Sequence, residues 1–176
     1  MWEVREGDVG KLEQLFDRHH RPLFHFFLHL TASRATAEDL VQEAFYRILK
    51  YRHTYQREMP FRAWLFQIGR NVHLDYAGRH KGEVSLPEDV VELRGPDMPP
   101  DRQAQKKQET VLLRRALAAL PSEKREVLIM SRFMEMKHEE IATVLKCEVG
   151  TVKVRVYRAL RELSDRFFAL SGERAS

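Results

Sequence analysis

The sequence predicts an all-α protein, built from two small helical bundles that a flexible linker joins. Apolar side chains recur at three- and four-residue intervals along most of the chain, which places them on one face of a helix. No stretch of useful length alternates apolar and polar residues as a half-buried strand does. The periodicity disappears over 82–101, which holds four of the seven prolines. This segment is the predicted linker between domains at 1–81 and 102–176.

The first predicted bundle starts with two helices. Residues 8–31 carry apolar side chains at helical spacing, with a break expected near Pro22, because proline lacks a backbone N–H. A second helix is predicted from Thr36, which together with Asp39 resembles a capping box. Its apolar side chains form one stripe, made of Leu40, Val41, Ala44, Phe45, Ile48 and Leu49.

Three further helices are predicted on either side of the linker. After a polar loop at 52–60, residues 61–81 have the apolar spacing of a third helix in the first bundle. Helical spacing returns over 102–119, and residues 122–133, which follow a proline, predict another helix.

The last part of the chain has the outline of a helix-turn-helix. Residues 138–163 predict two helices that meet at the turn KCEVG (146–150), and the second helix is basic. Wound at about 100° per residue, the second helix has a packed apolar side. That side consists of Val149, Val152, Val156, Ala159, Leu160 and Leu163. The residues predicted to lie nearest to DNA bases on the other side are Lys153, Val154, Tyr157 and Arg158. Arg155, toward a flank, is predicted to contact a phosphate or another part of the protein.

The charges are distributed unevenly along the chain. The whole sequence has a net charge of +4, but residues 47–81 have +6, and residues 102–145 and 146–176 have +3 each. Residues 82–101 between them have −5. Two basic blocks with an acidic connector suit a chain that contacts a polyanion at two places.

Several other classes of protein find no support in the sequence. The apolar cluster at 23–30 is too short to span a membrane, and no secretion signal precedes it, so a cytoplasmic protein without membrane insertion is expected. The single cysteine, Cys147, excludes an internal disulfide and a cysteine-rich zinc site. His25 and His29 have metal-binding spacing, but no third ligand is suggested and the neighbouring phenylalanines favour packing. No nucleophile–base pair or phosphate-binding loop indicates an enzyme, and no cofactor is expected.

With these motifs in view, the chain resembles the extracytoplasmic-function (ECF) group of bacterial RNA polymerase sigma factors, in the sigma-70 family. The resemblance covers residues 8–168. AEDLVQEAFYRIL at 37–49 is similar to the family's polymerase-binding stretch, and 61–81 is similar to its promoter-melting and upstream −10 segment. Residues 120–133 and 139–163 resemble its −35-recognising domain. Each motif alone is modest, but their order and spacing are specific.

The resemblance implies a dissociable specificity subunit of RNA polymerase and assigns roles to its residues. The side chains implied to bind the polymerase clamp are Asp39, Gln42, Glu43 and Arg47. Those implied to contact the −10 element are His53, Tyr55, Gln56, Arg57, Asn71, Asp75 and Arg79, the loop among them holding a base that has left the stack. Those implied to contact the −35 element are Gly150, Thr151, Lys153, Val154, Arg155, Tyr157 and Arg158. Promoter DNA, core polymerase and an anti-sigma factor are the implied partners.

Three residues depart from the family pattern. Lys146 stands where a turn glycine is common, so a less sharply bent turn is expected. Glu148 occupies a cap position usually taken by Ser or Pro, where its carboxylate is expected to accept backbone N–H bonds. Val154 replaces a frequent serine, and an apolar side chain there suits a thymine methyl group.

Two other functions fit parts of the same pattern. A self-sufficient helix-turn-helix regulator would bind a DNA operator tightly on its own, whereas an adaptor or decoy would bind proteins without promoter activity. The basic block at 47–81 favours the sigma factor, because a sensor domain has no need of such a charge.

Overall fold

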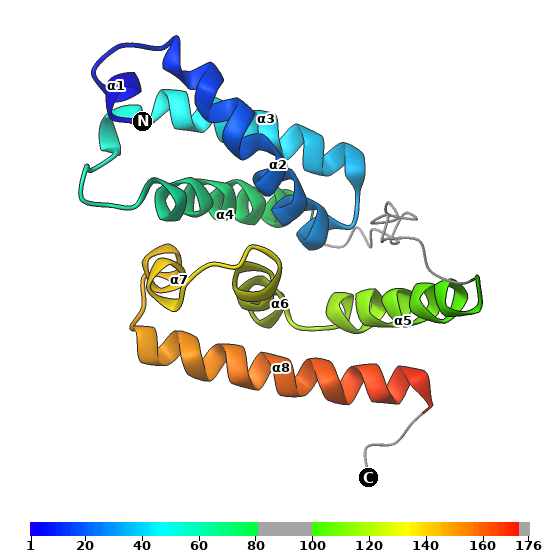
Figure 1. The fold of residues 1–176 in the computed structure, drawn as a ribbon. Helices are drawn as coiled ribbons and strands as arrows, with labels where there is room; N and C mark the ends of the chain where they lie inside the picture. Colours follow the sequence, from blue (N-terminus) through cyan, green and yellow to red (C-terminus); the bar gives the residue numbers. More distant parts are fainter. Residues whose placement is uncertain (81–99, 173–176) are drawn as a thin grey trace.

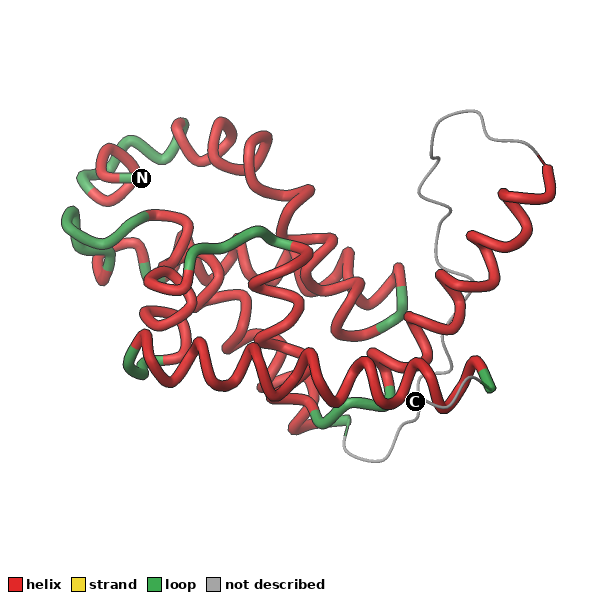
Figure 2. Tube along the Cα trace, turned by 60° about the horizontal axis from the view of Figure 1, so that its bottom comes forward, coloured by secondary structure: helices red, strands yellow, loops and turns green. Residues whose placement is uncertain are grey.

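The computed structural model describes the backbone of residues 1–80 and 100–172, and the side chains of 1–80 and 108–172. The predicted linker at 82–101 lies outside the described residues, except for its last two positions, which begin α5. The described chain is helical throughout, without a strand (Figures 1 and 2), which confirms the predicted all-α class. Its elements are α1 (Trp2–Arg5), α2 (Lys11–Thr31), α3 (Arg34–Lys50), η1 (Arg52–Thr54), α4 (Phe61–Arg79), α5 (Pro100–Ala118), α6 (Ser122–Leu128), the π-helical turn η2 (Ile129–Phe133), α7 (His138–Leu145) and α8 (Val149–Ser171).

Helix α2 runs unbroken through Pro22, so the predicted break is wrong. A proline in a helix interior costs about 3 kcal/mol, since it removes a hydrogen bond and crowds the preceding turn. Leu23, Phe26 and Phe27 follow directly and are completely buried against the rest of the first bundle. Burying each such side chain contributes about 1.5–3 kcal/mol, so packing outweighs the local cost of the proline.

Helix α3 begins earlier than predicted, and its cap is Ser33 rather than Thr36. The backbone of Ser33 is extended, and its hydroxyl oxygen accepts a hydrogen bond from the Thr36 amide at 3.3 Å. This bond satisfies one of the first-turn amides that a helix start leaves without a partner. The predicted apolar stripe is confirmed from Leu40 to Ile48, whereas its last member, Leu49, is half-buried and does not belong to the core cluster.

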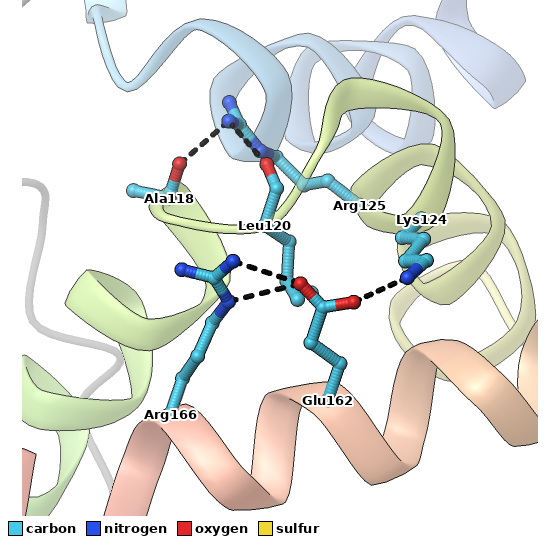
Figure 3. Close-up of polar contacts among 6 residues, drawn as sticks. All are labelled: Ala118, Leu120, Lys124, Arg125, Glu162 and Arg166. Carbon is cyan, nitrogen blue, oxygen red and sulfur yellow. Dashed lines mark hydrogen bonds and ion pairs between the residues drawn. The ribbon is translucent and has the colours of Figure 1, made fainter. Parts of the chain in front are cut away.

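The second bundle holds α8 by an apolar face and a polar network. Val152, Val156 and Ala159 are buried, and the other predicted inward residues of α8 pack partly buried against the same core. Figure 3 shows Glu162 of α8 between Lys124 of α6 and Arg166 one turn further along α8. Hydrogen bonds from these two cations lower the pKa of the Glu162 carboxyl. The buried apolar residues set the rotation of α8, and the contact between Lys124 and Glu162 ties the helix to α6.

The two bundles pack against each other, a contact that sequence analysis did not predict. Helix α4 of the first bundle lies against α7 of the second, and α2 lies against η2. Arg70 Nε is 2.8 Å from the Glu126 carboxylate, and Arg62 donates a hydrogen bond to the carbonyl oxygen of Met134. Burial raises the pKa of Glu126, although Arg70 opposes this shift. The attraction of Arg70 is therefore smaller than the free-energy cost of removing the Glu126 charge from water.

Two half-buried histidines lie at this contact. The His29 ring lies 4.2 Å from the Phe133 ring, centroid to centroid, which confirms the packing role expected for His29. Burial lowers the pKa of His29 and of His73 from 6.5 to about 4. Nearby positive groups lower these pKa values further; they are His25 and Arg114 for His29, and Arg125 and Arg70 for His73.

Acidification is therefore expected to weaken the contact between the bundles. Separation would expose both imidazoles to water, where the ordinary pKa applies, so the separated state binds more protons between about pH 4 and 6.5. The contribution of these two histidines to the packed state is complete above this window and is lost as the pH falls through it, whereas the raised pKa of Glu126 acts in the opposite sense. Small-angle scattering should give a larger radius of gyration at about pH 5 than at about pH 7.5, with helicity unchanged by circular dichroism.

A matched pair of variants tests the cause of this expansion. Replacing both His29 and His73 with glutamine should remove the expansion on acidification, whereas His53→Gln, in an exposed position, should keep it. If the double variant expands like the original protein, these histidines do not control the contact.

Candidate functional site

All seven residues predicted on the DNA-facing side of the helix-turn-helix are exposed. The two large side chains among them, Val154 and Tyr157, are 48% and 66% exposed. The full set is Gly150, Thr151, Lys153, Val154, Arg155, Tyr157 and Arg158. They occupy the first three turns of α8, which lies along α6 and α7 (Figure 1), and Arg155 is close enough to Glu126 of α6 to act on its pKa. This is a basic surface with an apolar centre, of the kind that enters a major groove.

The turn before α8 is as sharp as the one a glycine would give, so the expectation of a less bent turn at Lys146 is wrong. Lys146 has φ 51° and ψ 50°, in the left-handed region. The next amide, that of Cys147, donates to the Ala142 carbonyl oxygen at 3.0 Å and closes the end of α7. Cys147 also packs partly buried on the core, as expected of a small apolar residue. These contacts offset the steric cost of a left-handed lysine, about 1–2 kcal/mol.

Glu148 stands at the cap of α8 as predicted, but its side chain makes no capping hydrogen bond, which corrects the expectation. Its backbone is extended and Val152 N–H bonds to the Glu148 carbonyl oxygen, so the helix start is formed by the backbone alone. The glutamate side chain is exposed and longer than the Ser or Asp that fold back efficiently onto a first turn.

The residues predicted to bind polymerase and some of those predicted to bind the −10 element meet in one groove between α3 and α4. The groove has a volume of about 810 Å³, and Asp39, Glu43, Arg47, Asp75 and Arg79 line it. Gln42, the fourth residue predicted to bind polymerase, is exposed on α3 but does not line the groove, and Asn71 is exposed on α4. Two sets that sequence analysis treated separately are therefore neighbours.

Arg47 joins the two sides of this groove. Its guanidinium lies 2.6 Å from the Glu43 carboxylate on α3 and 2.5 Å from the Asp75 carboxylate on α4. Partial burial acts to lower the pKa of Arg47, but the hydrogen bonds to both carboxylates outweigh it and raise the pKa. Glu43, Arg47 and Asp75 thus hold α3 against α4, while Asp39 and Gln42 remain on the surface.

The α3–α4 loop (residues 51–60) exposes three of its four predicted site residues and buries the fourth. His53, Gln56 and Arg57 are exposed, but Tyr55 is only 7% exposed. The Tyr55 ring packs edge-on against Trp64 at 5.3 Å, and its hydroxyl donates to the Met59 carbonyl oxygen at 3.0 Å. Burial raises the pKa of this phenol. In this structure the Tyr55 ring has no free face for a base, because it anchors the loop to the core.

Two residues at the start of the chain join the same loop, and sequence analysis missed them. Arg5 donates a hydrogen bond to the Tyr55 carbonyl oxygen at 2.8 Å. The Trp2 ring lies beside two guanidinium groups, with the Arg5 and Arg57 carbons 4.6 and 5.8 Å from its centroid. A four-residue helix is too short to give a periodic pattern, so the sequence carried no signal for this contact.

Two general searches complete the description of the site. Within residues 1–80 and 108–172, no group of three or more His, Cys, Asp or Glu side chains is placed to hold a metal ion. None of the described helices combines the length and apolar character needed to cross a membrane.

Comparisons with known proteins find matches to both bundles. A family model described as Sigma-70 region 2 matches residues 15–83, and one described as Sigma-70, region 4 matches residues 110–163. The ECF RNA polymerase sigma factor SigM of Bacillus subtilis is 27% identical over 154 residues, which are 86% of this chain and 92% of the relative. The ECF RNA polymerase sigma factor SigL of Mycobacterium tuberculosis is 31% identical over 160 residues, 89% of each chain.

Two solved structures have a similar fold. CnrH, in complex with the cytosolic domain of CnrY, has a TM-score of 0.71 and 26% identity, over 95% of this chain and 94% of that chain. The sigma factor RpoE of Bartonella quintana, in complex with the anti-sigma factor NepR, has a TM-score of 0.67 and 23% identity, over 88% of this chain and 94% of that chain. The second likeness concerns the fold alone.

Proposed function

Because the chain belongs to the sigma-70 family, as an ECF RNA polymerase sigma factor, we propose that its two bundles divide promoter recognition between them. A sigma factor is a transcription initiation factor that binds core RNA polymerase and directs it to promoters. In this division, the domain at 1–81 binds core polymerase and the −10 element, and the domain at 102–176 binds the −35 element. The protein acts by binding, without a catalytic step of its own, and works in the cytoplasm with its polymerase.

The observation that carries this proposal is the exposed face of α8. Its apolar side is buried, so the rotation of the helix is set, and the opposite side presents Lys153, Val154 and Arg158 together. Arginine can donate two parallel hydrogen bonds to a guanine edge, and valine suits a thymine methyl group. Because Glu148 makes no capping bond, the first amides of α8, at Gly150 and Thr151, are available to a DNA phosphate.

On the first bundle, the polymerase contact is assigned to the exposed residues Asp39 and Gln42. Glu43 and Arg47 support this surface from the groove, where they are half-buried and paired with each other. This divides the four predicted residues into two that contact the clamp and two that hold α3 in place.

The −10 contact is assigned to the α3–α4 loop and the outer face of α4. His53, Gln56 and Arg57 are the loop side chains that can meet an unpaired base, while Tyr55 anchors the loop from below. Asn71 and Arg79 are exposed on α4, toward the upstream part of the element, and Asp75 contributes by holding Arg47.

Binding both promoter elements requires the bundles to separate. By their names the two elements lie about 25 base pairs apart, which is about 85 Å of B-DNA at about 3.4 Å per base pair. A compact chain of this length has a radius of gyration of about 16 Å and a diameter of about 40 Å. The packed arrangement therefore belongs to the protein off the promoter, and the contact at Arg70 and Glu126 opens when the polymerase complex forms.

An anti-sigma factor is a fitting partner for the packed form. The RpoE structure of similar fold is a complex with the anti-sigma factor NepR, and the CnrH structure is a complex with the cytosolic domain of CnrY. We propose that a protein of this kind binds the present chain and competes with core polymerase.

Run-off transcription with purified core polymerase tests the proposed function. Adding the protein should produce transcripts from a specific set of genomic promoters, and the free protein should bind the same duplexes only weakly. Tight, sequence-specific binding by the free protein at physiological salt would favour a stand-alone regulator. Polymerase binding without any promoter-dependent transcript would favour an adaptor.

A further inference from the structure

Helix α1 lies against the α3–α4 loop, and three of its four residues are engaged there or in the core. Val4 is completely buried, which fixes the short helix to the first bundle. Arg5 reaches from α1 to the Tyr55 carbonyl oxygen, 50 positions further along the chain, at 2.8 Å. Trp2 lies beside Arg57 at 5.8 Å, measured from the guanidinium carbon to the ring centroid. Figure 1 shows α1 at the end of the bundle where this loop runs.

These contacts hold the loop at two points on its surface. The hydrogen bond from Arg5 has a charged donor, and such bonds are roughly twice as strong as neutral ones. The indole of Trp2 attracts the guanidinium of Arg57 through the negative face of the ring. Since Tyr55 already anchors the loop from the core side, the loop backbone and the Arg57 side chain are both restrained before any ligand arrives.

Restraint of this kind matters for a loop that captures an unpaired base. If a loop must become ordered on binding, the lost conformational entropy lowers its affinity for the ligand. A loop that is already held in place avoids this loss. Arg57 is exposed and, once oriented, can stack on a base or pair with the adjacent phosphate. The orientation of Arg57 is therefore a determinant of which base the loop accepts.

We propose that α1 is a clamp on the −10-binding loop, in which Trp2 and Arg5 are positioning residues that act through Arg57 and the Tyr55 backbone. This rests on the proposed binding of the −10 element by the α3–α4 loop. The ligand is the single-stranded promoter DNA of that element. Trp2 and Arg5 do not read a base themselves; they set the place of the group that does.

Replacing Trp2 with alanine should change −10 selectivity without disturbing the rest of the protein. Trp2 is 37% exposed, so its truncation leaves a small hole in the surface rather than a cavity in the core. The assay is transcription by reconstituted polymerase from a promoter library randomised across the −10 element. Trp2→Ala and Arg5→Ala should each reduce discrimination at the base position that depends on Arg57, about two- to fivefold, the size of one exposed cation–π contact. Preference at the −35 element, core polymerase affinity and melting temperature should stay the same.

Matched variants separate positioning from general damage. Trp2→Phe retains an aromatic face and should keep most of the discrimination. Val9→Ala removes another exposed apolar residue near the same terminus, and Arg18→Ala removes an exposed arginine of α2, so neither should alter base preference. Equal losses from these controls would overturn the clamp.

A double-mutant cycle tests whether Trp2 acts through Arg57. In an Arg57→Ala background, Trp2→Ala should cause no further loss of discrimination, because the positioned group is already absent. Additive losses would mean that Trp2 acts independently of Arg57, either by contacting DNA or through Arg5, and would overturn its positioning of Arg57. If Arg57→Ala alters −10 preference but Trp2→Ala and Arg5→Ala do not, the clamp is wrong and the loop assignment stands. If Arg57→Ala itself has no effect, the loop assignment is wrong and the clamp falls with it.

Discussion

Replacing Arg158 with alanine is expected to cost about 1–3 kcal/mol of −35 recognition and to relax the preference at one or two base pairs. Arg158 is exposed on the outward face of α8, and that face cannot rotate away because Val152, Val156 and Ala159 on the opposite side are buried. A guanidinium so placed can offer two parallel donors to the O6 and N7 atoms of a guanine. Alanine removes both donors and leaves the helix otherwise intact.

The measurement is transcription from a promoter library randomised across the −35 element. Arg166→Ala is the matched control, because Arg166 hydrogen-bonds Glu162 on the same helix and lies beyond the exposed turns that face DNA. Val154→Ser should shift the preference at a single base pair, since it exchanges a methyl contact for a hydroxyl. A uniform loss of output from Arg158→Ala, with base preference unchanged, would make Arg158 a phosphate contact instead.

The double variant Asp39→Arg/Gln42→Ala is expected to bind core polymerase at least about tenfold more weakly. The arginine reverses the charge at position 39, and a like charge placed at an interface costs several kcal/mol. Both side chains are exposed on α3, so the free energy of unfolding should change by no more than about 0.5 kcal/mol. Glu43 is left in place on purpose. It holds Arg47, which in turn holds Asp75, and its reversal would set two cations side by side at the groove.

Affinity for core polymerase is measured with labelled protein, and circular dichroism checks the fold. Glu13→Arg makes the same change of charge at an exposed position of α2 and should leave the affinity unaltered. Normal affinity for the Asp39→Arg/Gln42→Ala variant, with a normal spectrum, would remove this face of α3 from the polymerase contact.

The two predictions differ in how much of their basis came from the sequence and how much from the structure. For α8, the apolar residues repeat with the helical period, so the buried and exposed faces followed from winding the helix, and the structure confirms them. For α3, the stripe was equally clear, but the polar residues beside it looked alike. The position of α4 separates them. Glu43 and Arg47 are half-buried and tied to α4 through Asp75, whereas Asp39 and Gln42 stay exposed.

Four local expectations failed for the same reason. The break at Pro22, the cap at Thr36, the relaxed turn at Lys146 and the capping bond from Glu148 were each inferred from the preferences of one or two residues. Each preference is worth only about 1–3 kcal/mol, which packing or a neighbouring hydrogen bond can exceed. Leu23 and Phe26 keep the helix intact past the proline, and Ser33 offers a cap before Thr36 is reached.

The sequence by itself determined the longer helices, their buried faces and the two basic blocks, because the period of apolar residues and the sum of charges are properties of neighbouring positions. Only the tertiary structure decided that Tyr55 is an anchor, that α1 holds the loop, and that the bundles meet at Arg70 and Glu126. Arg47 and Asp75 are 28 positions apart, and Arg5 and Tyr55 are 50 apart. Contacts over such separations form when helices pack, and they follow from the positions of those helices rather than from any pattern along the chain.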